Sequence, residues 1–330
     1  MGNKVSVLQT IRYSDLFDFP VTEAEIWQYL ISTKPISKKQ LHDILKKMQG
    51  KEIGFRSPYY YLPGREKIVA LRKSRQIASR EKLEQVKTLL SWFSFIPTLR
   101  YAGISGSLAR MNADKHDDID LFIITEAKTV WVTRLLLLTL LQFLGKRRKR
   151  GEQHAQDKIC LNFLLDTRYV AFSQNRHDVY TAYEIGQLKT LYDRNNTYSQ
   201  FLRANRWIKK YLPHFSYEKM TPQDTKSFMS KVLCFVCFAF EPLARLFQLW
   251  IIQQTQTSEI VTDGIAAFHP HDYRPFILKS FAHSASKSSS GASKKGSLWG
   301  IDKAKPIIYT RKDYTVSPNT PLERLSFKRL

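Results

Sequence analysis

One stretch of the chain constrains its fold and its chemistry more than any other. The apolar segment 99–104 ends in a small polar turn, and ten residues after this turn two aspartates alternate with apolar residues. The residues concerned are Ser105, Gly106 and Ser107 in the turn, and Asp118 and Asp120 in the acidic segment. Successive side chains of a strand point to opposite faces, so we expect both carboxylates on one face of a second strand, with Ile119 and Leu121 packed on the other.

This pair of carboxylates predicts a cation site. Two neighbouring carboxylates repel each other and lose hydration, which a cation between them offsets. Mg²⁺ prefers carboxylate oxygens and keeps coordination positions open for water and substrate phosphates. In the turn, glycine lets the backbone approach a ligand, and the amides and hydroxyls of Ser105 and Ser107 can hold phosphate oxygens, more strongly if a helix begins at Leu108. The stretch therefore predicts a site for Mg²⁺ and a nucleoside triphosphate.

These residues resemble the nucleotidyltransferase signature of the DNA polymerase beta superfamily. The signature is a hydrophobic residue, Gly, Gly or Ser, a gap of about ten residues, and Asp-x-Asp inside an apolar strand; Gly106-Ser107 and Asp118-Ile119-Asp120 match it, with Ser105 at the usual hydrophobic position. The resemblance covers residues 99–166. It implies an α+β fold with a polymerase beta-like sheet and flanking helices.

The same resemblance implies a magnesium-dependent transfer of a nucleoside monophosphate from a triphosphate, with ATP the expected nucleotide, to an acceptor that the sequence does not identify, with release of pyrophosphate. Asp118 and Asp120 would hold one or two Mg²⁺ ions. The triphosphate would be bound by the turn, with a further phosphate contact from Arg110 or Lys115. The residues expected to bind the nucleotide are Ser105, Gly106, Ser107, Arg110 and Lys115.

The third acidic position of this family is the main departure. Families with the signature place a third carboxylate on the next strand, predicted here over residues 158–166, and the mid-strand residue at that place is Asn162. On a regular strand Cys160, Asn162, Leu164 and Asp166 share one face, and Asp166 lies ~13 Å beyond Asn162. Either Asp166 takes the role after a bend, or two acids suffice with Asn162 beside them, or activity has been lost.

The rest of the chain divides into further segments. Three helices, the second with a cap at Thr22 and Glu25, and a hairpin resemble a winged-helix domain, and a long basic helix connects it to the sheet. Residues 176–283 read as a helical region, and a Ser-, Lys- and Gly-rich tail is expected to be disordered. The predicted divisions are 1–64, winged-helix-like; 65–96, connecting helix; 97–175, nucleotidyltransferase domain; 176–283, helical domain; and 284–330, basic tail.

The winged-helix resemblance provides an alternative function. The third helix of such domains can enter the DNA major groove. Here it carries Lys38, Lys39, Lys46 and Lys47. The chain would then be a DNA-binding regulator or a toxin–antitoxin component with a weak or inactive nucleotidyltransferase fold; a winged helix can equally serve as a packing module with solvated lysines.

Charge favours polyanionic partners. The chain has 52 Lys and Arg against 29 Asp and Glu, a net charge of +23, which favours nucleic acid, nucleotides or an anionic membrane surface. A run of five cations over residues 146–150 is either a solvated turn or a polyanion patch.

The remaining features favour a cytoplasmic protein. Three cysteines form no disulfide framework, and Cys234 and Cys237 are expected to be core thiols. The N-terminus lacks the apolar core of a signal peptide. The apolar stretches 135–144 and 232–252 are expected to be buried helices, because the first is too short to span a membrane and Glu241 and Arg245 interrupt the second, so no transmembrane segment is predicted.

Overall fold

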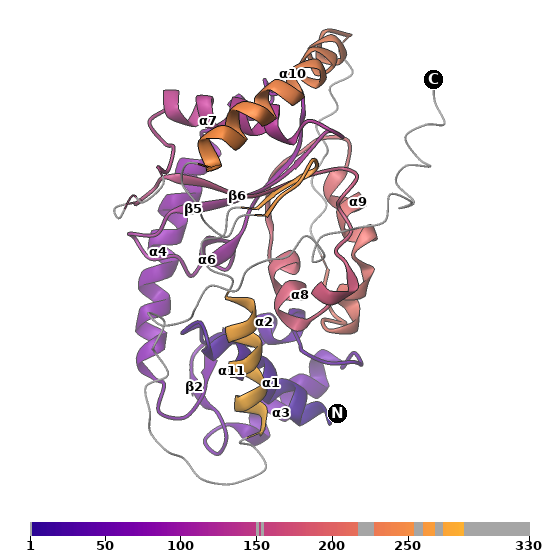
Figure 1. The fold of residues 1–330 in the computed structure, drawn as a ribbon. Coiled ribbons are helices and arrows are strands. Elements are labelled where there is room, and N and C mark those ends of the chain that lie inside the picture. The colour runs from indigo at the N-terminus through magenta and orange to yellow at the C-terminus, as the bar shows by residue number, and fades with distance from the viewer. Residues whose placement is uncertain are drawn as a thin grey trace.

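The computed structural model describes residues 2–149, 152, 155–216, 228–253, 260–267 and 273–286, and it shows an α+β fold (Figure 1). This confirms the predicted class at that level. A three-stranded sheet lies in an N-terminal unit, and a six-stranded mixed sheet forms the centre of the molecule. Nearly all of the predicted tail lies outside the described residues.

The N-terminal unit packs three helices against a small antiparallel sheet. Capping boxes begin its second and third helices, at Thr22 with Glu25 and at Ser37 with Gln40, because each cap side chain and its partner satisfy amides of the first turn. The strand order is β1-β3-β2. The elements are α1 (Asn3–Asp15), β1 (Val21–Thr22), α2 (Glu23–Gln28), α3 (Lys38–Met48), β2 (Gly54–Arg56) and β3 (Tyr59–Tyr61).

The connecting segment contains one long helix and one short helix, α4 (Lys67–Lys87) and α5 (Leu90–Phe93). In Figure 1, α4 runs from the N-terminal unit along the side of the molecule to the central sheet. Hydrogen bonds from Lys82 and Ser79 of α4 reach the loop between the first two strands of that sheet.

The central sheet has the order β7-β4-β5-β6-β9-β8. Only β5 and β6 are parallel, and every other neighbouring pair is antiparallel. The region predicted as helical also contributes strands to this sheet. The strands are β4 (Leu99–Ile104), β5 (Ile119–Thr125), β6 (Ile159–Asp166), β7 (Lys189–Asp193), β8 (Ile260–Val261) and β9 (Ile265–Ala267).

Helices cover both faces of the sheet. One face packs against α7 (Val130–Phe143) and α10 (Phe228–Gln253). The other faces α8 (Val179–Gly186) and α9 (Thr197–Ala204), and α11 (Arg274–Ser286) packs between α8 and α1. The last described helix thus links the N-terminal unit to α8 on this face of the sheet.

A β-bulge changes the face pattern predicted for β6. Leu121 pairs with Leu161 but Phe122 pairs with Phe163, so Asn162 has no partner on β5. Beyond this extra residue the alternation inverts: Leu161 packs on the α7 side, whereas Phe163 packs on the opposite side. The prediction that Cys160, Leu164 and Asp166 share a face was therefore wrong.

The prediction of a buried helix over 232–252 was also wrong. This stretch lies in α10, and only 17% of it is buried inside the structure. Among the described residues it is the one helix long and apolar enough to cross a membrane by length and composition. The prediction of a buried helix over 135–144 holds only in part, because Leu137 and Leu141 are fully buried whereas Leu136 and Phe143 are exposed.

Candidate functional site

The small turn after β4 brings the backbone against an aspartate. The amide of Ser105 donates to the Asp120 carbonyl at 3.0 Å, and α6 (Gly106–Ala109) begins directly afterwards. The helix therefore starts at Gly106, two residues before the predicted Leu108. Gly106 has a φ of +66°, and a Cβ there would lie 2.9 Å from the Asp120 Oδ2 atom. Only glycine allows this close approach without strain.

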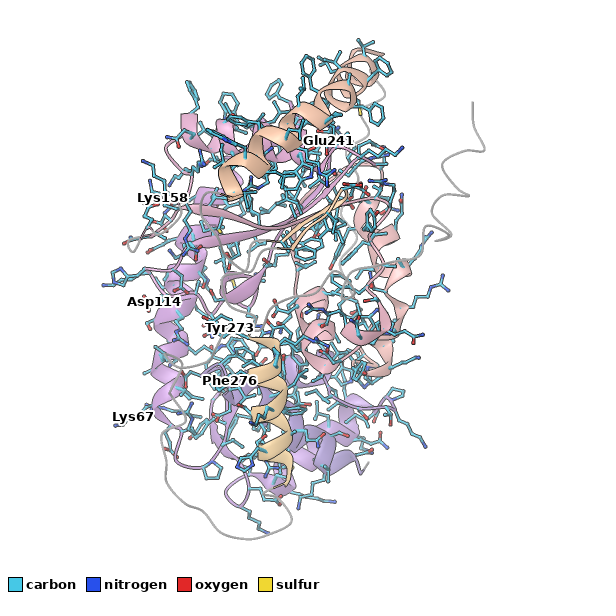
Figure 2. All side chains as sticks on the ribbon, in the orientation of Figure 1. Lys67, Asp114, Lys158, Glu241, Tyr273 and Phe276 are labelled. Carbon is cyan, nitrogen blue, oxygen red and sulfur yellow. The ribbon has the colours of Figure 1, made fainter. Side chains whose placement is uncertain are left out.

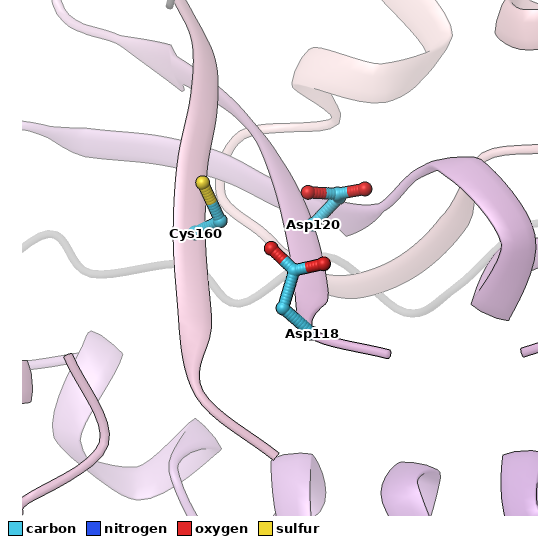
Figure 3. Close-up of side chains that lie close together, drawn as sticks. All are labelled: Asp118, Asp120 and Cys160. Carbon is cyan, nitrogen blue, oxygen red and sulfur yellow. The ribbon is translucent and has the colours of Figure 1, made fainter. Parts of the chain in front are cut away.

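Two carboxylates and one thiol converge beside this turn. The ligand atoms of Asp118, Asp120 and Cys160 all lie within 4.8 Å of one another (Figure 3). Asp120 and Cys160 are register partners on the parallel strands β5 and β6. The predicted pairing of Asp118 with Asp120 is present, and the third side chain of the cluster is Cys160.

Burial and mutual repulsion weaken the acidity of these groups. Burial, followed by the charge of Asp118, raises the pKa of Asp120 to about 8. Burial also raises the pKa of Asp118, against the lowering effect of Arg148. The pKa of the Cys160 thiol rises to about 12, because the group is buried beside both carboxylates. A divalent cation would reverse the cost of holding this negative charge.

Arg148 brings positive charge to the cluster. Its guanidinium forms an ion pair with Asp118, and its amide donates to the Ile159 carbonyl at 3.1 Å, so the basic run lies beside the start of β6. The spacing of the Gly-Ser turn and the two aspartates does not point to this arginine. The feature of the sequence that could have indicated its role is the run of five cations over residues 146–150, which lies between the acidic strand and the next strand.

A buried lysine on α4 fixes the loop that precedes Asp118. The Lys82 ammonium donates to the carbonyls of Lys115 and Asp117 at 2.9 and 2.7 Å, and to Asp157 Oδ1 at 2.8 Å. Lys82 is 2% exposed. One turn earlier, Ser79 accepts from the Ala113 amide at 3.1 Å. Lys82 is therefore a positioning residue for the acidic loop.

Replacing Lys82 by methionine is expected to lower the free energy of unfolding by about 2–4 kcal/mol, because three acceptors lose a charged donor. Urea unfolding measures the change. The matched control is Lys87→Met on the same helix, whose ion pair with Glu84 is exposed and for which we expect less than about 0.5 kcal/mol. Equal losses in the two variants would contradict the role given to Lys82.

Several residues predicted to belong to the site lie away from the acidic cluster or make other contacts. Asp166 is fully buried opposite Thr125, ~17 Å along the strand from the level of Asp120. It accepts from the Lys128 and Arg168 amides at 2.9 and 2.8 Å and pairs with the Arg168 guanidinium, so it closes a turn away from the cluster. The Asn162 side chain lies outside the described residues.

The two predicted phosphate-binding cations are also apart from the acidic cluster. Arg110 pairs with Glu184 at 3.0 Å and lies over the Phe17 ring, so it joins the N-terminal unit to the central domain. Lys115 is exposed and contributes its carbonyl to Lys82. In the turn, Ser107 Oγ donates to Asp117 Oδ2 at 3.1 Å, which ties the turn to the acidic loop.

Comparisons with known proteins gave no match to a family model, a curated protein or a solved structure. The geometry and chemistry of the site are therefore the evidence for its function.

Proposed function

We propose that the chain is a magnesium-dependent nucleotidyltransferase that transfers a nucleoside monophosphate from a triphosphate, with ATP as the expected donor, to an acceptor not yet identified. The observation that carries the proposal is the convergence of Asp118 and Asp120 beside Gly106, at the place where the Asp-x-Asp strand meets the Gly-Ser turn. On this proposal, the central sheet with its helices is a nucleotidyltransferase domain, and the N-terminal unit is a winged-helix domain.

The residues present fit a divalent cation. Two carboxylates lie within 4.8 Å of each other, and the raised pKa of Asp120 marks charge that the protein alone does not compensate. When bound, Mg²⁺ would lower the pKa of the acceptor hydroxyl and neutralise charge on the leaving pyrophosphate. Asp118 and Asp120 would hold the ion. Cys160 is a neutral thiol, so it adds no third negative charge to balance the charge of the ion.

The other residues would bind and orient the triphosphate. Gly106 lets the backbone come close to the acidic cluster, and Ser107, held by Asp117, presents the first amides of α6. Arg148 neutralises Asp118 in the structure described here. Its guanidinium is the cation best placed to exchange this carboxylate for a phosphate oxygen when the ion binds.

Cys160 stands in register with Asp120, so Cys160→Asp would complete a set of three acids. We expect this variant to bind Mn²⁺ about tenfold more tightly, since a charged oxygen replaces a neutral thiol. Cys160→Ala is the control and should bind Mn²⁺ as the natural chain does. Isothermal titration measures both constants; a strong loss of binding in Cys160→Ala would show that the thiol itself is a ligand.

The direct test follows label from each nucleoside triphosphate. Purified protein is incubated with Mg²⁺ and α-³²P-labelled triphosphates, with and without RNA, DNA and host lysate. We expect transfer of label to one acceptor class, lost in Asp118→Asn. Absence of transfer with every triphosphate and acceptor fraction, from protein that binds nucleotide, would refute the enzyme.

One observation favours the alternative of a DNA-binding regulator. The four lysines of α3 are all exposed, whereas Leu41, Leu45 and Met48 of the same helix are buried, so the helix presents a basic outer face. Retention of specific DNA at elevated salt would support that function, because non-specific charge binding collapses there. Its loss on replacing Lys38 and Lys39 by glutamine would locate the contact on α3.

A further inference from the structure

The outer face of α10 is an extended apolar surface. Six of its large side chains are each between 52% and 73% exposed, and they are Phe235, Phe240, Leu243, Leu246, Phe247 and Trp250. Figure 2 shows side chains projecting from this helix away from the sheet. At the end of the neighbouring helix α7, Phe143 is 83% exposed. Exposed apolar surfaces of this extent are typical of binding faces.

Two polar residues of α10, Glu241 and Gln248, are buried against the protein. Glu241 accepts from the Trp131 and Val132 amides at 3.0 and 2.8 Å, which caps the N-terminus of α7. Gln248 donates to the Trp131 carbonyl at 2.7 Å. Glu241 and Gln248 thus hold α10 on α7, and Arg245, the other charged residue of this stretch, pairs with Asp263 at 2.5 Å.

Length and burial separate this helix from an ordinary core helix. Residues 232–252 comprise 21 residues with a mean hydropathy of 1.7. They extend ~31 Å along the helix axis, a length comparable with the hydrocarbon thickness of a bilayer. A core helix of similar composition would be mostly buried, whereas this one is 17% buried, and it lies far from the N-terminus.

Positive charge follows the apolar end of α7 in the sequence. Lys149, which is exposed, and Lys146 and Arg147, which are partly exposed, follow Phe143 within a few residues, and the whole chain carries a net charge of +23. The Lys146 ammonium donates to Gln85 Oε1 at 2.8 Å, so Lys149 is the most exposed of the three. Cations beside exposed aromatic and aliphatic side chains match the headgroup and acyl layers of an anionic membrane surface. A second copy of the chain would bring the same positive charge to the interface.

We propose that the outer face of α10, with the end of α7, binds the surface of an anionic lipid bilayer. The apolar side chains enter one leaflet and the cations contact lipid phosphates. The helix lies along the membrane and does not cross it, because Glu241 and Gln248 fix its inner side to α7. Asp118, Asp120 and Cys160 lie on the opposite face of the sheet from α7 and α10, so the cluster stays in water.

Vesicle flotation tests this proposal on the full chain. The natural protein is mixed with phosphatidylcholine vesicles that contain or lack phosphatidylglycerol, over a series of NaCl concentrations. We expect it to float with the anionic vesicles and less with the neutral ones. Replacing Phe235, Leu246 and Trp250 by glutamine should weaken partition by about tenfold for each side chain removed from the acyl layer.

The matched control is Ile77→Gln on α4, whose side chain is 60% exposed on another surface, and it should float like the natural protein. Circular dichroism checks that each variant is folded. Light scattering without lipid measures self-association. The proposal is overturned if the natural protein floats with neither kind of vesicle and forms a dimer that the triple variant does not form. The outer face of α10 would then bind a second copy of the chain.

Discussion

Asp120→Asn is expected to lower nucleotidyl transfer by about a thousandfold while the protein stays folded, because a neutral amide replaces one of two charged ligands of the catalytic cation. The change is isosteric, and Asp120 retains its backbone contact with Ser105. Initial rates at saturating Mg²⁺ measure the effect. Asp43→Asn, at an exposed carboxylate of α3, is the control and should keep the full rate.

The same variant should be more stable than the natural chain at alkaline pH without metal. Folding raises the pKa of Asp120 from 3.8 to about 8, so the folded state binds a proton that the unfolded state releases. The natural protein therefore loses stability as pH rises from about 4 to about 8, and the full cost persists above that range. Thermal unfolding in EDTA should show a higher melting temperature for Asp120→Asn at pH 9 and little difference at pH 4. An equal difference at both values would contradict the raised pKa.

Gly106→Ala is expected to reduce transfer by about a hundredfold, because the added Cβ would crowd the Asp120 carboxylate, 2.9 Å away, and displace it from the cation. The control separates crowding from backbone strain. Gly145 has a φ of +65° but no atom within 4 Å of an added Cβ. Both variants should lose about 1 kcal/mol of stability to the left-handed backbone, and only Gly106→Ala should lose activity. Rates and urea unfolding of the two variants, side by side, provide the test; equal activity losses would place the effect in the backbone strain.

Local patterns predicted much of the fold and part of the candidate site. The alternation of Asp118 and Asp120 with Ile119 and Leu121 placed the acids on one face, since it depends only on the period of a strand. The cap of α2 and the hairpin of β2 and β3 followed from residues close in sequence. These features involve no distant contact, which explains why sequence reasoning reached them.

The misplaced residues depend on contacts between distant segments. The bulge at Asn162 arises from pairing with β5 and turns the later residues of β6 to the other face, while the parallel register before it places Cys160 beside Asp120. Lys82 reaches the acidic loop from a helix more than thirty residues away in sequence. Composition indicated that the stretch 232–252 is buried, but Glu241 and Gln248 attach it to α7 along one side only.

The most direct test of the central claim is a titration with Mn²⁺, followed by electron paramagnetic resonance, in the presence and absence of a non-hydrolysable ATP analogue. We expect the natural protein to bind Mn²⁺ and the analogue to tighten this binding. The double variant Asp118→Asn/Asp120→Asn should bind neither Mn²⁺ nor the analogue above the level of a buffer control. Mn²⁺ binding that is unchanged in the double variant, or that the analogue leaves unaffected, would contradict a metal and nucleotide site at these two aspartates.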